Sequence, residues 1–238
     1  MTRWQKYSAE FLGTFILVFM GTTGIVASNT LTSGNTSFAE IVVPIGFGLA
    51  LLAGLYAFAE VSGGHFNPAV SLGLFLDGRL SVPDLGGYWL FQFAGAIAAS
   101  ALMLVPFNKT AVAGTATIPN PAIGDGGAFL LETAFTAIFV AVILESTKRE
   151  RHHGTALLAI PLTLVSIHVA LIPFTGASVN PARTLAPAIV GDKWDSEWIY
   201  FLGPALGAII AWLIFSVVVK GDVGRKPQPA PSQAGPTG

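Results

Sequence analysis

Cysteine is absent from all 238 residues, which excludes disulfide bonds, thiol catalysis and metal sites built from thiolates. Charge is also scarce, because Lys, Arg, Asp and Glu make up only 11% of the chain while 53% of the residues are hydrophobic. A soluble domain carries about 25% charged residues, so we expect a membrane protein without a separate soluble domain. The sequence shows no nucleophile–base pair, cofactor-binding loop or grouped metal ligands, and we expect no enzymatic activity, cofactor, metal or nucleic-acid partner.

Long apolar segments between the charged residues predict six helices that cross a membrane, at 8–28, 39–59, 85–107, 128–144, 155–173 and 198–219. Two shorter segments, 68–76 and 181–190, would form helices about 14–15 Å long at roughly 1.5 Å per residue. This is half of the roughly 30 Å of a bilayer core, so these helices can enter a membrane but cannot cross it. The first span carries Glu10 and lacks a small-residue cleavage site, which argues against a cleavable signal peptide.

The same tripeptide begins both short segments, once as Asn67-Pro68-Ala69 and once as Asn180-Pro181-Ala182. Asn followed by Pro is a strong signal for a helix start, because Asn caps unpaired amides and Pro lacks the N–H that would otherwise be unpaired. A third copy at 120–122 is followed by a Gly-rich stretch instead of an apolar one, and we interpret it as a turn. The specific signal is the placement of two copies in matching contexts.

The two halves of the chain form an internal repeat. Glu10 in the first span pairs with Glu132 in the fourth, and Gly95 in the third pairs with Gly207 in the sixth. Each half has three spans, an odd number, so the second half enters the bilayer upside down relative to the first. We therefore predict an all-α membrane protein with six transmembrane helices and two re-entrant half-helices that meet near the midplane. The repeats cover about 8–107 and 128–219, and a linker at 108–127 joins them.

The placement of Lys and Arg predicts the orientation of the chain. If the N-terminus is cytoplasmic, nine basic residues lie inside, namely Arg3, Lys6, Arg79, Lys148, Arg149, Arg151, Lys220, Arg225 and Lys226. Only Lys109 and Lys193 then lie outside. We expect a channel domain at 1–220 and a disordered cytoplasmic tail at 221–238, which is rich in Pro and Gly. The expected location is the plasma membrane, with both termini in the cytoplasm.

The two loops before the half-helices are predicted to contact water. Non-helical backbone at membrane depth is tolerated only where it is buried in protein or lines a water-filled cavity. The loops 62–66 and 175–179 should therefore offer carbonyl oxygens to water, and we count Gly63, Gly64 and Gly176 as possible lining residues. His65 in the first loop either lines the approach to this cavity or braces the loop, and the sequence does not distinguish these two roles.

Three charged side chains are predicted at membrane depth. Arg183 is costly there unless it meets water or carbonyl groups, and we prefer a cavity-facing Arg over a salt bridge with Glu10 or Glu132. For these two acids we prefer a structural role, in which each accepts hydrogen bonds from amides and hydroxyls of the loops. A proton relay is the competing role, but no series of acids follows one face.

The segments 62–70 (SGGHFNPAV) and 178–183 (SVNPAR) resemble the signature loops of the aquaporin, or major intrinsic protein, family. The similarity extends over about residues 8–219 and points to the water-channel branch. It implies a single-file pore past both Asn-Pro-Ala motifs, and monomers that assemble as homotetramers. It also implies a narrow ring near the outer mouth, which carries over by spacing to Phe47, His168, Ala177 and Arg183.

From the motifs and the resemblance we expect a passive water channel that excludes protons and ions. Bulky Phe47 and His168 leave little width, and Thr184 follows Arg183 where glycerol-conducting relatives typically have Asp. Ala177 departs from the Thr or Cys common at its position, so passage of hydrogen peroxide or ammonia stays open. The sequence is also compatible with a channel of the aquaglyceroporin type, with a weakly conducting structural member of the same fold, and with a secondary transporter, which likewise uses inverted repeats.

Overall fold

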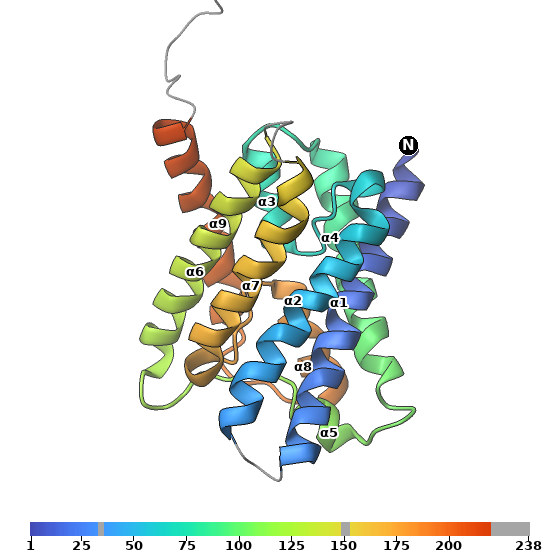
Figure 1. The fold of residues 1–238 in the computed structure, drawn as a ribbon, viewed down its shortest axis with the longest axis vertical. Helices are drawn as coiled ribbons and strands as arrows, with labels where there is room; N and C mark the ends of the chain where they lie inside the picture. Colours follow the sequence, from blue (N-terminus) through green and yellow to red (C-terminus); the bar gives the residue numbers. More distant parts are fainter. Residues whose placement is uncertain (33–35, 149–152, 220–238) are drawn as a thin grey trace, which may run out of the picture.

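A computed structural model describes residues 1–32, 36–148 and 153–219, and within these ranges the regular structure is entirely helical (Figure 1). Six helices are long and apolar enough to cross a membrane, which confirms the predicted number of spans. They are α1 (Arg3–Thr32), α2 (Thr36–Ser62), α4 (Val82–Leu102), α6 (Gly124–Ser146), α7 (His153–Thr175) and α9 (Trp198–Ile214), the last continued by a π-helical turn (Phe215–Val219).

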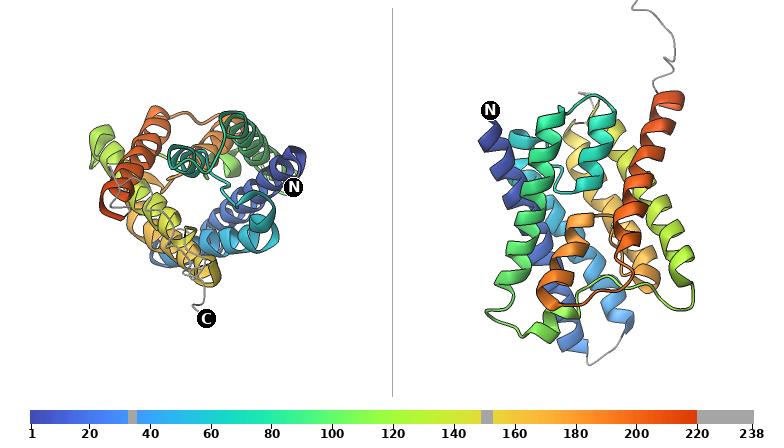
Figure 2. Two further views of the ribbon diagram at one scale, coloured as in Figure 1. Left: turned by 90° about the horizontal axis from the view of Figure 1, so that it is seen from above. Right: turned by 180° about the vertical axis from the view of Figure 1, so that it is seen from behind.

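The two short helices α3 (Pro68–Leu76) and α8 (Pro181–Gly191) form where the sequence predicts them. Each begins with an Asn cap, because Ala69 N donates to Asn67 Oδ1 at 2.9 Å and Ala182 N donates to Asn180 Oδ1 at 3.0 Å. Both helices contact α4 and α9, and they occupy opposite halves of the bundle with their first turns toward its middle (Figure 2, right). The structure therefore has the predicted pair of half-helices, which meet end to end.

The helix contacts repeat between the two halves. Helix α1 packs on α4 in the first half as α6 packs on α9 in the second, and α2 packs on α7 across the halves. The paired glycines mark the two equivalent contacts: a Cβ at Gly95 would collide with the carbonyl oxygen of Phe11, and a Cβ at Gly207 would collide with that of Thr133. Small residues at such positions let helix backbones approach closely, so the repeat seen in the sequence is also a repeat in packing.

The segment between the halves differs from its prediction. Helix α4 ends at Leu102, whereas we expected the third span to continue to residue 107, and residues 103–106 form turns instead. Pro106 accounts for the difference, because it has no N–H to bond to the Leu102 carbonyl and its ring clashes with the carbonyl four residues earlier in a continued helix. The linker also contains a short helix, α5 (Lys109–Ala113), that we did not predict, although Asn108 caps it by accepting from Ala111 N at 2.9 Å.

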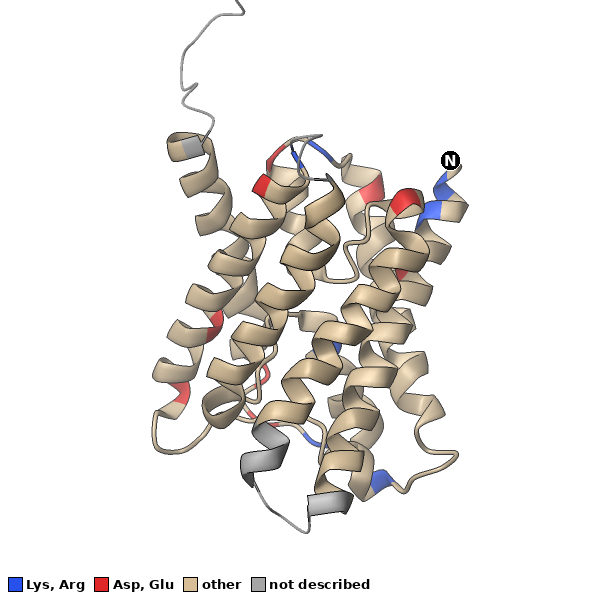
Figure 3. Ribbon diagram, in the orientation of Figure 1, with Lys and Arg blue, Asp and Glu red and all other residues tan. Residues whose placement is uncertain are grey.

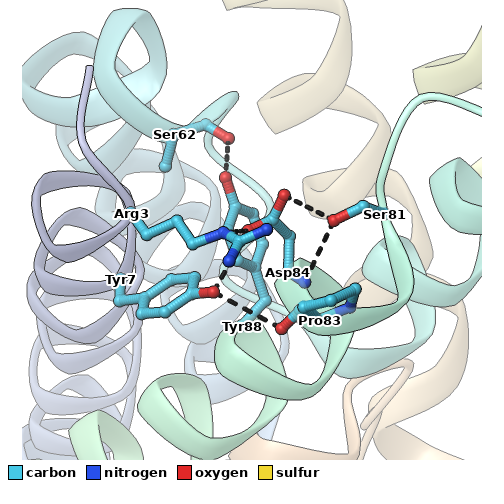
Figure 4. A network of polar contacts seen from close by, with 7 residues as sticks. All are labelled: Arg3, Tyr7, Ser62, Ser81, Pro83, Asp84 and Tyr88. Atoms are coloured by element: carbon cyan, nitrogen blue, oxygen red, sulfur yellow. Dashed lines mark hydrogen bonds and ion pairs between the residues drawn. The ribbon is translucent and has the colours of Figure 1, made fainter.

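Polar contacts fasten the start of α1 to the start of α4 (Figure 4). The Asp84 carboxylate forms an ion pair with Arg3 Nε at 3.1 Å and accepts a hydrogen bond from the Tyr7 hydroxyl at 3.1 Å. Ser81 caps α4 by accepting from Asp84 N. These contacts hold α1 helical from Arg3, five residues before the predicted start of the span at residue 8.

Most charged residues lie at the two ends of the bundle, and few lie between them (Figure 3). At the end that carries the N-terminus, Arg79 bonds to Asp77 and to α6 near its C-terminus. At the other end, Lys109 pairs with Asp192 at 3.3 Å. This distribution is typical of a protein with a membrane around its middle. The basic residues of the loop 149–152 and the tail predicted at 221–238 lie outside the described residues.

Candidate functional site

Glu10 of α1 holds the first re-entrant loop. Its carboxylate is fully buried and accepts hydrogen bonds from Ser62 Oγ at 2.6 Å, His65 N at 3.0 Å and Phe66 N at 2.7 Å. The loop needs this support because its backbone enters the left-handed region, with φ of 94° at Gly63 and 48° at Phe66. A non-glycine residue in that region costs about 1–3 kcal/mol unless its surroundings hold it there.

Glu132 of α6 makes the matching contacts with the second loop. It is fully buried and accepts from Thr175 Oγ1 at 2.7 Å, Ser178 N at 2.9 Å and Val179 N at 2.7 Å. The loop has the same backbone pattern, with positive φ at Gly176, Ala177 and Val179. Each carboxylate thus accepts hydrogen bonds from two loop amides and one hydroxyl. This geometry supports the structural role that we preferred for both acids.

Two tyrosines that the sequence analysis missed complete these networks. The Tyr88 hydroxyl donates to the carbonyl oxygen of Ser62 at 2.5 Å, and the Tyr200 hydroxyl donates to that of Thr175 at 2.7 Å. Both tyrosines are buried. A signal was available, because the two tyrosines are separated by the same number of residues as the paired Gly95 and Gly207.

The two Asn-Pro-Ala motifs are bonded to each other's loops. Asn67 Nδ2 donates to the carbonyl oxygen of Val179 at 2.8 Å, and Asn180 Nδ2 donates to that of Phe66 at 3.0 Å. The Oδ1 of each Asn is used as the helix cap. Since an amide nitrogen carries two hydrogens, each Asn keeps one N–H for another acceptor. The structure therefore brings two amide donors together at the junction of α3 and α8.

The third Asn-Pro-Ala lies in a turn, as predicted, and also closes the end of α7. Asn120 N donates to the carbonyl oxygen of Phe174 at 2.8 Å, and Asn120 Nδ2 donates to that of Pro173 at 3.0 Å. Its Oδ1 accepts from Ala122 N at 2.9 Å. The tripeptide thus makes the same local cap in all three places, but this copy is exposed and lies outside the junction of the half-helices.

A cavity of about 260 Å³ passes the junction of the half-helices and is lined by both Asn67 and Asn180. Lys6, Arg79 and Thr147 line it at the end of the bundle that carries the N-terminus. Much of the remaining wall is apolar and includes Leu17, Leu51, Val70, Leu74, Phe139, Ile143, Ile160, Leu164 and Val179. An apolar wall interrupted by polar groups orients a small solute without holding it tightly.

Polar groups of the first loop form another part of the wall. Gly63, Gly64 and His65 line the cavity, whereas Gly176 of the second loop does not. His65 Nδ1 lies 3.0 Å from Ser71 Oγ, and the ring packs edge-on against Tyr88. His65 therefore both lines the cavity and is braced within the loop, so the two roles considered for it are compatible.

Beyond the two asparagines, three side chains from different elements meet. Phe47 of α2 and His168 of α7 stack with ring centroids 4.7 Å apart, and Arg183 Cζ lies 5.1 Å from the centroid of Phe47. All three are buried and line the cavity. Ala177, the fourth residue assigned to the ring, is fully buried in the second loop but is not part of this wall.

The polar atoms of this cluster are partly available for a solute. His168 Nδ1 lies 3.0 Å from the carbonyl oxygen of Leu164, and Arg183 Nη1 donates to that of Thr115 at 3.0 Å. Among the described residues, His168 Nε2 and Arg183 Nε have no protein partner. Within the same part of the chain, Arg183 makes no ion pair with Glu10 or Glu132. The cluster therefore presents polar atoms to the cavity beside one positive charge.

Arg79 is a further lining residue that the sequence analysis counted only as a basic residue. Its Nε contacts Asp77 Oδ2 at 2.6 Å, its Nη1 donates to Thr147 Oγ1 at 2.8 Å and its Nη2 donates to the carbonyl oxygen of Leu144 at 2.8 Å. The partners of Arg79 on α6 are distant from it in sequence and left no local signal. Arg79 fastens the chain after α3 to α6 at the mouth of the cavity.

Comparison with known proteins places these features in a family. The family model described as "Major intrinsic protein" matches residues 1–215. A "Glycerol uptake facilitator protein-like 6" of Lactiplantibacillus plantarum is 40% identical over 87% of this chain and 94% of its own length. An "Aquaporin Z" of Brucella melitensis is 38% identical over 93% of this chain and 99% of its own length.

A solved structure has the same fold. The aquaglyceroporin from Plasmodium falciparum superposes with a TM-score of 0.79 at 25% identity, over 92% of this chain and 97% of that one. The relatives thus include proteins named for water and for glycerol, so they do not separate the two branches. Family match, identity and fold agree: the chain belongs to the major intrinsic protein family, whose members are multi-pass membrane channels and not enzymes.

Proposed function

We propose that this channel conducts water passively and excludes protons and ions. The observation that carries the proposal is that one cavity contains both the Asn67–Asn180 pair and the cluster of Phe47, His168 and Arg183. Each Asn offers one N–H to the oxygen of a passing water, because its other N–H and its Oδ1 are already used. The pore motifs in this proposal are 67–69 and 180–182.

Electrostatics explains the proposed exclusion of cations and protons. The N-terminus of a helix carries about half a positive elementary charge, and α3 and α8 direct both N-termini at the same point. A water that accepts from both Asn side chains presents its hydrogens outward and cannot accept from its neighbour, which interrupts proton transfer along the file. Arg183 adds a full positive charge nearby, so cations meet two successive barriers.

The selectivity filter that we propose consists of Phe47, His168 and Arg183, which line the cavity, and of Ala177, which lies in the adjoining second loop. Stacking of Phe47 on His168 at 4.7 Å fills much of the width beside Arg183. The unpartnered His168 Nε2 and the Arg183 guanidinium can hydrogen-bond water in the remaining space. A narrow polar ring suits water better than a polyol, whose carbon chain needs more width and an apolar contact surface.

Glycerol is the second candidate permeant, because a glycerol uptake facilitator-like protein is 40% identical to this chain. Ala177 contributes a small side chain at its position, which favours a wider ring and adds hydrogen peroxide and ammonia to the candidate permeants. A weakly conducting structural member of the family is a further candidate. Water and glycerol fluxes measured on the same protein discriminate among these functions.

The test uses proteoliposomes and stopped-flow light scattering with water and glycerol gradients side by side. Wild-type protein should accelerate osmotic shrinkage strongly and leave glycerol entry at the level of empty vesicles. His168→Gly, alone or with Phe47→Ala, should admit glycerol because it opens the ring. Equal glycerol entry in wild type and variant would remove His168 from the filter, and shrinkage no faster than that of empty vesicles would refute the water channel.

We also propose the assembly and orientation that the sequence predicts. The channel domain at 1–220 comprises the repeats 8–107 and 128–219, and four copies form a homotetramer with one pore in each. The N-terminus lies in the cytoplasm of a plasma-membrane protein, so that Lys6 and Arg79 stand at the inner mouth. The charged ends of the bundle support a membrane around its middle.

A further inference from the structure

A chain of buried hydroxyl groups connects the linker to the cap of α8. Thr117 Oγ1 lies 2.8 Å from Thr184 Oγ1, Thr184 donates to Ser178 Oγ at 2.6 Å, and Ser178 Oγ donates to the carbonyl oxygen of Asn180 at 3.0 Å. Ser178 Oγ also accepts from Asn180 N at 3.2 Å. A hydroxyl has one hydrogen to donate, and Thr184 uses its own toward Ser178. Thr117 is therefore the donor at the start of the chain.

The first half of the protein contains the same arrangement with a different anchor. Ser71 stands four residues after its Asn, as Thr184 does in the second half, and it contacts His65 Nδ1 at 3.0 Å. Gln92 Nε2 donates to Ser71 Oγ at 2.9 Å. Gln92 belongs to the spanning helix α4, whereas Thr117 belongs to the linker. Both half-helices thus have a third side chain that fastens them, and in the second half the linker supplies it.

The same stretch of linker also contacts Arg183 and the second loop. The carbonyl oxygen of Thr115 accepts from Arg183 Nη1 at 3.0 Å. A Cβ at Gly176 would lie 3.1 Å from Thr117 Cα, so the linker backbone packs directly on the loop. Thr115, Thr117 and Thr184 are all buried. Arg183 lies between Asn180 and Thr184 in α8, so a displacement of Thr184 also displaces the guanidinium.

We propose that Thr117 is a positioning residue for selectivity: through Thr184 and Ser178 it fixes the first turn of α8, and thereby the place of Arg183 beside Phe47. The side chain touches no permeant, since it is absent from the cavity wall. The inference rests on the proposed conduction of water past Arg183. Its consequence is that a change in the linker alters what the pore rejects without altering any residue that lines it.

Thr117→Val tests the proposal, because valine keeps the shape of threonine and removes the hydroxyl. Proton leak is measured with a pH-sensitive dye inside proteoliposomes, and water flux is measured on the same vesicles. We expect water flux per channel to stay close to wild type and proton leak to rise about fivefold, the population shift produced by losing one buried hydrogen bond. Arg183→Val supplies the upper limit of the leak.

Three further variants make the test specific. Thr117→Ser keeps the hydroxyl and should restore wild-type tightness. Thr163→Val is the matched control, because among the described residues the Thr163 hydroxyl bonds only to the carbonyl oxygen of Ala159 within its own helix. Thr184→Val should leak like Thr117→Val, and the double variant should leak no more than Thr184→Val, because both changes break one chain. Thr117 also contacts Tyr200. Thr184→Val breaks the hydroxyl chain but leaves that contact in place, so it distinguishes the role of the chain from that of the Tyr200 contact.

Several results would overturn the proposal. They are a Thr117→Val channel as tight as wild type, a Thr163→Val channel equally leaky, or a Thr117→Ser channel as leaky as Thr117→Val. If Thr117→Val lowers water flux only because less folded channel is present in the vesicles, Thr117 serves general folding, and this result would overturn the proposal as well. Failure of the proposed function is distinguishable, because wild-type vesicles would then show no accelerated shrinkage.

Discussion

Equivalent residues in the two halves of this channel have equivalent structural roles. Glu10 and Glu132 each accept hydrogen bonds from two loop amides and one hydroxyl, and in the described part of the chain neither forms an ion pair with a basic residue. A buried carboxylate is stable in this setting because charge-assisted hydrogen bonds replace its hydration. The loops in turn depend on the carboxylates, since their amides have no helical partner. Loss of either acid should therefore damage the loops first.

Glu132→Gln should destabilise the protein. One carboxylate oxygen becomes an NH₂ group that faces a donor, and leaving a buried group unsatisfied costs about 1–3 kcal/mol. We expect a lower melting temperature in detergent and reduced water flux, with a larger loss for Glu132→Ala. Glu60→Gln is the control, because Glu60 is an exposed acid on α2. Equal melting temperatures for the two Gln variants would contradict the structural role.

Ala177→Cys should make water flux sensitive to mercurials. Wild type contains no cysteine, so its flux should resist these reagents. A mercury adduct at position 177 would narrow the proposed ring and stop conduction. Val169→Cys on α7 is the control, because Val169 is adjacent to His168 in sequence but half exposed on the outside of the bundle. Unblocked flux in a fully labelled Ala177→Cys channel would show that residue 177 lies off the pathway.

At the scale of helices, local signals were predictable and distant contacts were not. The start of α3 follows from Asn67 and Pro68, because a cap and a proline act within one turn. The partner of Arg79 on α6 and the Thr117 contact with α8 depend on how the helices assemble, and neither residue type is specific for such contacts. Tyr88 and Tyr200 were partly predictable, since the internal repeat pairs the two residues but does not indicate which groups they bind.

The α6–α9 contact should respond to a single methyl group. A Cβ at Gly207 would collide with the Thr133 carbonyl oxygen and lie 2.8 Å from Thr136 Cβ, so Gly207→Ala forces the helices apart. Overpacking of this kind costs about 1–3 kcal/mol, and the melting temperature should fall. Gly86→Ala places the same methyl group in open space on α4 and should be neutral or stabilising by up to about 1 kcal/mol. Equal effects in both variants would refute the predicted close approach.

On the scale of the whole molecule, the two ends of the bundle differ in what they carry. One end has the N-terminus, Arg79 and the C-terminal end of α6, and the other has α5 with Lys109. The absence of cysteine makes this asymmetry directly measurable, because any introduced thiol is the single reactive site. Orientation can therefore be determined without first removing native thiols.

Lys109→Cys should react with a membrane-impermeant maleimide added to intact cells, because we place residue 109 outside. Thr2→Cys should react only after the cells are lysed. Both positions are exposed in the structure, so access within the protein is not limiting. Labelling of Thr2→Cys in intact cells, with Lys109→Cys protected, would reverse the proposed orientation.

The reciprocal bonds between the half-helices also constrain biogenesis. Asn67 donates to Val179 and Asn180 donates to Phe66, so each tip is completed by a carbonyl more than a hundred residues away in the chain. During synthesis the first three spans emerge with Asn67 lacking its acceptor until the second half has been inserted. The bonds at the centre of the protein can therefore form only after the second half has been inserted. Neither half, expressed without the other, contains the carbonyl acceptor for its own Asn.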